Sequence, residues 1–242
     1  MLSHWLKSKT KAKRLQKHID FVGLPASGKT TVYRALIESN FQNTSGYKVV
    51  TLQSDVPKYR KYPVLLFIFF IKLPDVLFVL YFFMRYTRYS LLNLYRLRSI
   101  LKLILQTDYE LRTQTFDFYC NNGVLHHLID IEFGEKNTTL AINKFIRYFK
   151  DYYDALVLID MSKAELASRM SQRQTQDKKL AKYFSDTVFK NNWLEYTYEQ
   201  YKILRNILIN RNKPLLVLSA GDLVEEKVQS LQHFLQSNYP KL

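Results

Sequence analysis

Cysteine is almost absent from the sequence, which has only Cys120 among its 242 residues. A single cysteine excludes an internal disulfide and agrees with a protein of the reducing cytoplasm. A secretory signal is also missing, because residues 1–18 contain no continuous apolar stretch and carry six lysines and arginines without an acid. We therefore predict a basic N-terminal arm over residues 1–18. It is either a solvated segment or one that contacts anionic lipid or another acidic surface.

Acidic residues are scarce relative to basic ones: 21 Asp and Glu stand against 36 Lys and Arg, which leaves a formal charge of +15 at pH 7. Such a charge attracts nucleotides, polyphosphates, anionic lipids and nucleic acids without distinguishing among them. No nucleic-acid recognition motif accompanies the basic residues, so the sequence does not predict a nucleic-acid partner. Apolar residues make up 47% of the chain, which favours one folded domain over disorder.

A clean membrane-spanning segment is lacking too, although residues 62–106 are strongly apolar. The two apolar runs in this region are each too short to cross a bilayer. Joined into one helix, they would place Lys72 and Asp75 near the bilayer centre, at a cost of about 2.5–3.5 kcal/mol each, and Pro74 would interrupt the helix. We predict an inserted helical region, which either packs on the core, forms a dimer, or dips into a membrane interface.

Short apolar runs bounded by turn residues alternate with segments of helical periodicity along the rest of the chain. We expect strands at residues 19–22, 48–52, 115–119, 155–159 and 214–218. We expect helices at residues 31–37, 138–151, 163–173, 192–210 and 223–237. This alternation predicts right-handed crossovers and a five-stranded parallel sheet covered by helices on both faces. The fold class is therefore a three-layer α/β domain over residues 19–242.

The strongest motif is the run Gly23-Leu24-Pro25-Ala26-Ser27-Gly28-Lys29-Thr30, which matches G-x-x-x-x-G-K-[ST] and lies between an expected strand and an expected helix. Its glycines let the backbone approach phosphate oxygens, which the amide groups and the positive helix end attract. Lys29 is expected to bridge the β- and γ-phosphates, and Thr30 to bind Mg²⁺. The predicted cofactors are ATP and Mg²⁺. The predicted nucleotide-binding residues are Gly23, Leu24, Pro25, Ala26, Ser27, Gly28, Lys29, Thr30 and Thr31.

This loop and the order of the expected elements resemble the nucleoside-monophosphate-kinase-like group of P-loop proteins, which includes thymidylate, shikimate and adenylylsulfate kinases. The run from Gly23 to Thr31 is also similar to the loop of small P-loop kinases encoded among bacterial polysaccharide-biosynthesis genes. The resemblance implies the three-layer P-loop NTPase fold, ATP as phosphoryl donor and a small-molecule acceptor. Its second part implies a sugar or a glycan precursor as that acceptor.

In kinases of this group, the helix after the fourth strand opens a lid over the transferring phosphoryl group. The resemblance places this lid at residues 169–191, with Lys29 in the loop and Arg169 and Arg173 in the lid as catalytic residues. The two arginines are four residues apart on one helix face, so both can reach one phosphate. A solvated basic helix face is the alternative interpretation of the pair.

Related kinases carry an acid after the second strand, a position that the resemblance assigns to Asp55. This carboxylate is predicted to orient the acceptor hydroxyl or take its proton, and to bind Mg²⁺ together with Thr30. The alternative is an aspartate that caps the turn before Pro57. After the third strand, where an acidic metal ligand is expected, the sequence has Asn121 and Asn122, and amides bind Mg²⁺ more weakly than carboxylates.

Four further polar residues follow that third strand. Asp130 and Glu132 are acids, but they lie beyond the turn in which the metal ligand is expected. His126 and His127 are adjacent, and no second pair at ligand spacing accompanies them, so the sequence favours polar packing over a metal site.

The sequence thus predicts ATP-dependent phosphoryl transfer to a small-molecule acceptor by a cytoplasmic enzyme. Two alternatives stay open: a nucleoside monophosphate kinase, and a nucleotide-binding regulatory or membrane-associated module with little catalysis. A GTPase is not expected, because no D-x-x-G follows the third strand and residues 212–215 lack the guanine-reading aspartate. Homodimerisation and peripheral attachment to the inner face of the membrane also stay open.

Overall fold

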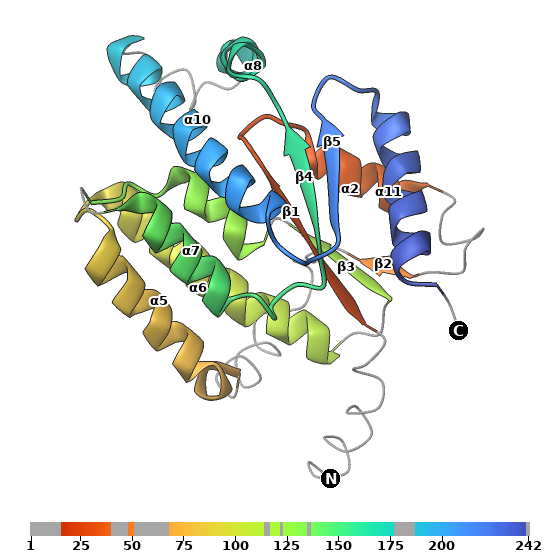
Figure 1. The fold of residues 1–242 in the computed structure, drawn as a ribbon, viewed down its shortest axis with the longest axis horizontal. Coiled ribbons are helices and arrows are strands. Elements are labelled where there is room, and N and C mark those ends of the chain that lie inside the picture. The colour runs from red at the N-terminus through yellow and green to blue at the C-terminus, as the bar shows by residue number, and fades with distance from the viewer. Residues whose placement is uncertain are drawn as a thin grey trace.

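The computed structural model describes residues 16–39, 48–50, 68–113, 117–121, 123–134, 137–176 and 187–240. Within them, five strands form one parallel sheet in the order β2-β3-β1-β4-β5 (Figure 1). The strands are β1 (Lys17–Gly23), β2 (Val49–Val50), β3 (Phe118–Asn121), β4 (Ala155–Asp160) and β5 (Leu215–Ser219). The expected parallel α/β architecture is confirmed.

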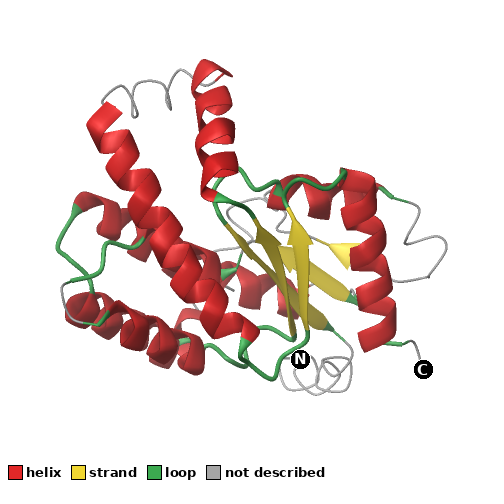
Figure 2. Ribbon diagram, turned by 45° about the horizontal axis from the view of Figure 1, so that its top comes forward, coloured by secondary structure: helices red, strands yellow, loops and turns green. Residues whose placement is uncertain are grey.

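Helices cover both faces of the sheet, as the alternating pattern predicted (Figure 1). They are α2 (Lys29–Glu38), α5 (Leu73–Tyr86), α6 (Leu91–Thr113), the 3₁₀-helix η1 (Val124–Asp130), α7 (Thr138–Tyr148), α8 (Lys163–Gln176), α10 (Thr187–Ile209) and α11 (Val224–Asn238). Helices α2 and α11 pack together on one face, while α5, α6, α7, α10 and η1 occupy the other. Helix α8 projects away from the sheet after the carboxyl end of β4 (Figure 2).

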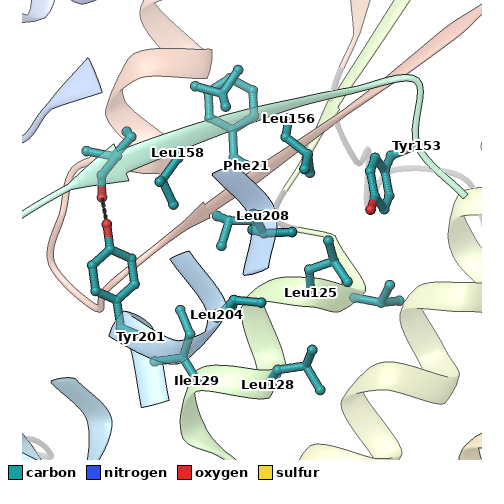
Figure 3. Packing of buried hydrophobic residues seen from close by; sticks show 14 of the residues in the cluster. Phe21, Leu125, Leu128, Ile129, Tyr153, Leu156, Leu158, Tyr201, Leu204 and Leu208 are labelled. Atoms are coloured by element: carbon teal, nitrogen blue, oxygen red, sulfur yellow. Dashed lines mark hydrogen bonds between the residues drawn. The ribbon is translucent and has the colours of Figure 1, made fainter. Parts of the chain in front are cut away.

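One part of the core lies between the central strands and the helices α10 and η1 (Figure 3). Phe21 of β1 and Leu156 and Leu158 of β4 face Leu204 and Leu208 of α10. All of these side chains are buried, and β4 is apolar on both sides because helices cover both faces of the sheet. Helix η1 contributes Leu125, Leu128 and Ile129 to this part of the core, among others.

Strand β1 begins at Lys17, two residues before its expected start, because Lys17 and His18 pair in register with the first residues of the parallel strand β3. The N–H of His18 donates to Oδ2 of Asp154 over 2.9 Å, and Nζ of Lys17 lies 3.3 Å from Oδ1 of Asp154. The last residues of the basic arm predicted over residues 1–18 therefore belong to the sheet. Residues 1–15 of that arm lie outside the described residues.

The described part of the insertion predicted at residues 62–106 is mainly helical, and it consists largely of α5 and most of α6. Pro74 lies in the first turn of α5, where a missing N–H is tolerated. Nζ of Lys72 lies 3.2 Å from a carboxylate oxygen of Asp75 and 3.7 Å from one of Asp108. Across the described parts of the chain, no helix is long and apolar enough to cross a membrane.

Helix α5 and the turn before it present an exposed apolar stripe. Its five side chains follow helical spacing and are between 38% and 65% exposed: Phe70, Leu73, Leu77, Tyr81 and Met84. The stripe is compatible with the dimer and with the membrane interface that the sequence left open, and both stay predictions.

Cys120 lies in β3 and is completely buried. It is paired in register with Ile19 of the central strand β1. Burial raises the pKa of its thiol to about 12, so the thiol is protonated and unreactive at neutral pH.

Candidate functional site

The loop between β1 and α2 turns sharply at the carboxyl end of β1, and its two glycines make this turn sterically feasible. A Cβ at Gly23 would lie 2.7 Å from the carbonyl oxygen of Ile159 in β4, which no side chain tolerates. Gly28, the residue before α2, has a φ of 90°, in the region that favours glycine. The backbone N–H groups at the start of α2 are thereby available for an anion.

Lys29 is the first residue of α2, and its side chain is folded back over the loop. Its Nζ donates to the carbonyl oxygens of Gly23 (2.8 Å) and Leu24 (2.7 Å) and to Oγ of Ser27 (3.2 Å). Burial lowers the pKa of Lys29 to about 7; Asp130 opposes this effect and Arg173 adds to it. A bound anion would therefore favour the protonated amine of Lys29 and could replace the carbonyl oxygens as its hydrogen-bond partners.

A cavity of about 560 Å³ opens at this loop. Elements from across the chain meet around it: the loop, the start of α6, η1, α8 and the start of α10. Its lining residues are Pro25, Ala26, Ser27, Gly28, Lys29, Thr30, Thr31, Leu92, Tyr95, Arg96, His126, Asp130, Met170, Arg173 and Trp193. The cavity thus combines helix-start N–H groups with three cationic side chains, an arrangement that attracts polyphosphate.

Asp130, the last residue of η1, is the carboxylate of this cavity. Its Oδ2 lies 2.9 Å from NH2 of Arg96 on α6, whereas its Oδ1 has no hydrogen-bond partner among the described residues. Burial raises the pKa of Asp130, and the charges of Arg96 and Lys29 partly oppose that rise. Asp130 lies beyond the turn in which a metal ligand was expected, so it was not among the site residues predicted from the sequence.

The two histidines of η1 are half-buried near the same cations. Burial lowers the pKa of His127 to about 4 and that of His126 well below its usual range, and Lys29 and Arg96 add to both effects. Both rings are therefore neutral at pH 7. Within the ranges that the structure describes, no three His, Cys, Asp or Glu side chains cluster as a metal site would require.

The two arginines predicted to form the lid lie in different surroundings. Arg169 is half-buried, and its guanidinium donates to the carbonyl oxygens of Ala26 (3.3 Å) and Ala220 (2.7 Å). Arg173 is exposed and lines the cavity. The structure therefore brings Arg173 to the candidate site and ties Arg169 to the loop backbone, while residues 177–186 of the predicted lid lie outside the described residues.

Some of the remaining predicted site residues line the cavity, and others lie outside the described residues. Thr30 and Thr31 line the cavity at the start of α2. Asp55 and Asn122 lie outside the described residues, and Asn121 ends β3. A bound Mg²⁺ could take one oxygen ligand from the Thr30 hydroxyl, and this metal ordinarily completes its shell with phosphate oxygens and water. The described residues thus fit a phosphate-borne Mg²⁺.

A second cavity, of about 590 Å³, adjoins the first and shares Leu92, Asp130 and Trp193 with it. Its other lining residues are Arg88, Ser90, Glu132, Phe133, Asn192, Tyr196 and Thr197. Hydrogen bonds make this wall rigid. The side chain of Asn93 bonds the backbone of Arg88 and Glu132, and the Tyr196 hydroxyl bonds the backbone of the segment after η1.

Comparison with known proteins finds matches among solved structures. No family model and no curated protein sequence matches the chain. Among solved structures, a deoxyadenosine kinase from M. mycoides with bound dATP is 13% identical, with a TM-score of 0.48 over 91% of this chain and all of the other.

Proposed function

We propose that this protein transfers the terminal phosphoryl group of ATP to a small-molecule acceptor. The observation that carries the proposal is the cavity at the start of α2, into which Lys29, Arg96 and Arg173 bring positive charge. Phosphoryl transfer depends mainly on positioning and on cations around the three oxygens of the moving group. In this cavity the N–H groups of the loop would hold the phosphates, and Lys29 would exchange its carbonyl partners for the β- and γ-phosphates.

Mg²⁺ would be held by Thr30 together with phosphate oxygens and water, and it would neutralise the charge that develops on the phosphates. Arg173 would cover the transferring group from α8. Arg169 donates to the carbonyl oxygen of Ala26, which keeps the middle of α8 close to the loop that would bind the phosphates.

The second cavity would hold the acceptor, because it meets the first beside Asp130 and Trp193. Three of its lining residues are aromatic, Phe133, Trp193 and Tyr196, and two are acids, Asp130 and Glu132, against the single cation Arg88. Aromatic faces accept a flat or ring-shaped molecule, and carboxylates accept hydrogen bonds from hydroxyl groups. The lining therefore favours an uncharged ring compound with hydroxyl groups, such as a nucleoside or a sugar, over a phosphorylated acceptor.

Replacing Lys29 tests the donor half of the proposal. The Lys29→Ala variant should weaken MgATP binding about 10–100-fold, because it removes a charged hydrogen-bond donor to two phosphates. Calorimetric titration with MgATP measures this change. Lys202→Ala is a matched control, because Lys202 is an exposed lysine of α10 that pairs with Glu199 and lines neither cavity. Equal MgATP affinity in wild type and Lys29→Ala would refute the proposed donor site.

An acceptor panel tests the other half. ADP release should rise when a nucleoside or a monosaccharide is added with MgATP. Stimulation by nucleoside monophosphates alone would instead support the nucleoside monophosphate kinase alternative.

A nucleotide-binding module without catalysis is the second candidate, and Asn121 and Asn122 favour it, because they stand where acidic metal ligands are expected. Such a module would bind MgATP and release no ADP with any acceptor. If the module is also membrane-associated through the apolar stripe of α5, the protein would sediment with vesicles that contain anionic lipid and not with neutral ones.

A further inference from the structure

Asp130 lies where the two cavities meet. Three residues line both cavities, and Asp130 is the only one of them with a titratable side chain, since the other two are Leu92 and Trp193. It is only 5% exposed, and η1 carries it there from the end of β3. A carboxylate at this junction can reach molecules bound in either cavity.

The two oxygens of Asp130 have different surroundings. Oδ2 is fixed by Arg96, which also sets the direction of the carboxylate. Oδ1 is buried without a hydrogen-bond partner among the described residues. A buried carboxylate oxygen without a partner is costly, and ligand sites are a frequent reason for keeping one. A hydroxyl group of a bound molecule would satisfy it.

We propose that Asp130 is the general base of the reaction, and this inference rests on the proposed phosphoryl transfer. Its Oδ1 accepts the proton of the acceptor hydroxyl while the hydroxyl oxygen forms a bond to the γ-phosphorus of ATP. The bond between that phosphorus and the oxygen bridging to the β-phosphate breaks, and ADP leaves with the electron pair. The proton passes from Asp130 to solvent after the products leave, which restores the carboxylate.

The surroundings of Asp130 set the pH range in which it can act. Neighbouring elements bring three basic side chains to the first cavity: Arg96 on α6, Lys29 on α2 and Arg173 on α8. His126 and His127 on η1 are neutral, and the charged residues on the wall of the second cavity are Arg88 and Glu132. Burial raises the pKa of Asp130, and Arg96 and Lys29 limit that rise. Asp130 is therefore ionised, and can act as a base, at pH values above its pKa. Turnover should fall as the pH decreases through the pKa of Asp130.

The test compares Asp130→Asn with Asp108→Asn. Both changes remove the charge from a buried carboxylate that pairs with a basic side chain, but Asp108 lines neither cavity. ADP formation is measured with MgATP alone, where water is the acceptor, and with each member of a panel of nucleosides and monosaccharides. MgATP affinity is measured by calorimetry, and folding by thermal melting.

We expect Asp130→Asn to lower turnover about 10²–10⁴-fold with every acceptor, while MgATP affinity changes less than about threefold. Asp108→Asn should keep wild-type turnover. Wild-type turnover in Asp130→Asn would overturn the general base and leave the proposed function intact. Loss of MgATP affinity in Asp130→Asn would also overturn it, because the carboxylate would then act on the nucleotide. Failure of the wild type to bind MgATP or to form ADP would refute the proposed function itself.

If Asp130→Asn does not fold, the Arg96→Gln variant tests the role of Asp130 independently through the pH–rate profile. Removing the cation beside Asp130 should raise the pKa of that carboxyl, so the acid limb of the pH–rate profile should move to higher pH. An unshifted limb would contradict the assignment.

Discussion

The loops after β1 and β3 make an instructive comparison, because these strands are parallel neighbours and both loops border the same cavity. After β1, seven consecutive residues line the cavity; all but Pro25 carry a backbone N–H group, and Lys29 adds its amine. After β3, the chain winds through η1, and its last residue brings a carboxylate back to the cavity. The first loop would bind a ligand through its backbone, which a short motif can specify, whereas the second would act through one side chain placed by tertiary packing.

Asp20 connects the two loops. It lies in β1, and its Oδ1 accepts a hydrogen bond of 2.6 Å from the N–H of Gly123, just before η1. Burial raises the pKa of Asp20 to about 6, which shows how strongly this carboxylate is removed from water. The start of η1 is thus positioned by the same strand that leads into the phosphate loop.

The largest expected effect on stability comes from adding a side chain at the contact between Gly123 and Asp20. A Cβ at Gly123 would lie 2.1 Å from Oδ2 of Asp20, so Gly123→Ala should destabilise the fold by about 3 kcal/mol. Urea denaturation measures this loss. Because the clash is specific, the same substitution should cost much less in an Asp20→Ala background. Equal costs in both backgrounds would show that η1 is not held by this contact.

A pH titration of nucleotide binding tests the loop after β1. Lys29 has a pKa of about 7 without a ligand, and bound phosphates would raise it, so binding is coupled to proton uptake. Apparent MgATP affinity should therefore fall about tenfold between pH 6 and pH 8, as the uncharged amine becomes dominant. Lys29→Arg is the control, because arginine stays charged across this range. A pH dependence shared by both proteins would belong to ATP and would contradict the role of Lys29.

The smallest effect concerns the contact between α8 and the loop. Arg169→Ala should lower the free energy of unfolding by about 1 kcal/mol, because two backbone carbonyls lose a charged donor. Arg173→Ala, at an exposed position on the same helix, should leave it unchanged. Urea denaturation of the two variants distinguishes a structural arginine from one that serves only the ligand. Equal stability of both variants would contradict the structural role of Arg169.

The comparison of the two loops also explains which features the sequence could predict. The eight-residue motif, the apolar run of β4 and the helical insertion were visible because each depends on consecutive or periodic residues. Asp130 was not assigned, because a short 3₁₀-helix has no distinctive periodicity and the carboxylate reaches the cavity only through the packing of η1. The second cavity was also out of reach, since its lining residues range from Arg88 to Thr197 along the chain.

Tertiary contacts also explain the features that differ from the sequence-based expectations. The early start of β1 depends on its pairing with β3, which is distant in sequence from Lys17. The position of Arg169 depends on the carbonyl oxygens of Ala26 and Ala220, which no spacing rule reveals. Such contacts appear only when the sheet brings the ends of its strands together.

The burial of Cys120 makes it a natural reporter for this sheet. Its thiol is fully enclosed next to β1, so a thiol reagent can modify it only during moments when β3 separates from its neighbours. No other thiol in the sequence competes for the reagent. The labelling rate of the unmodified protein therefore measures how often the strand that leads into η1 opens, and a ligand that stabilises this region would slow the labelling.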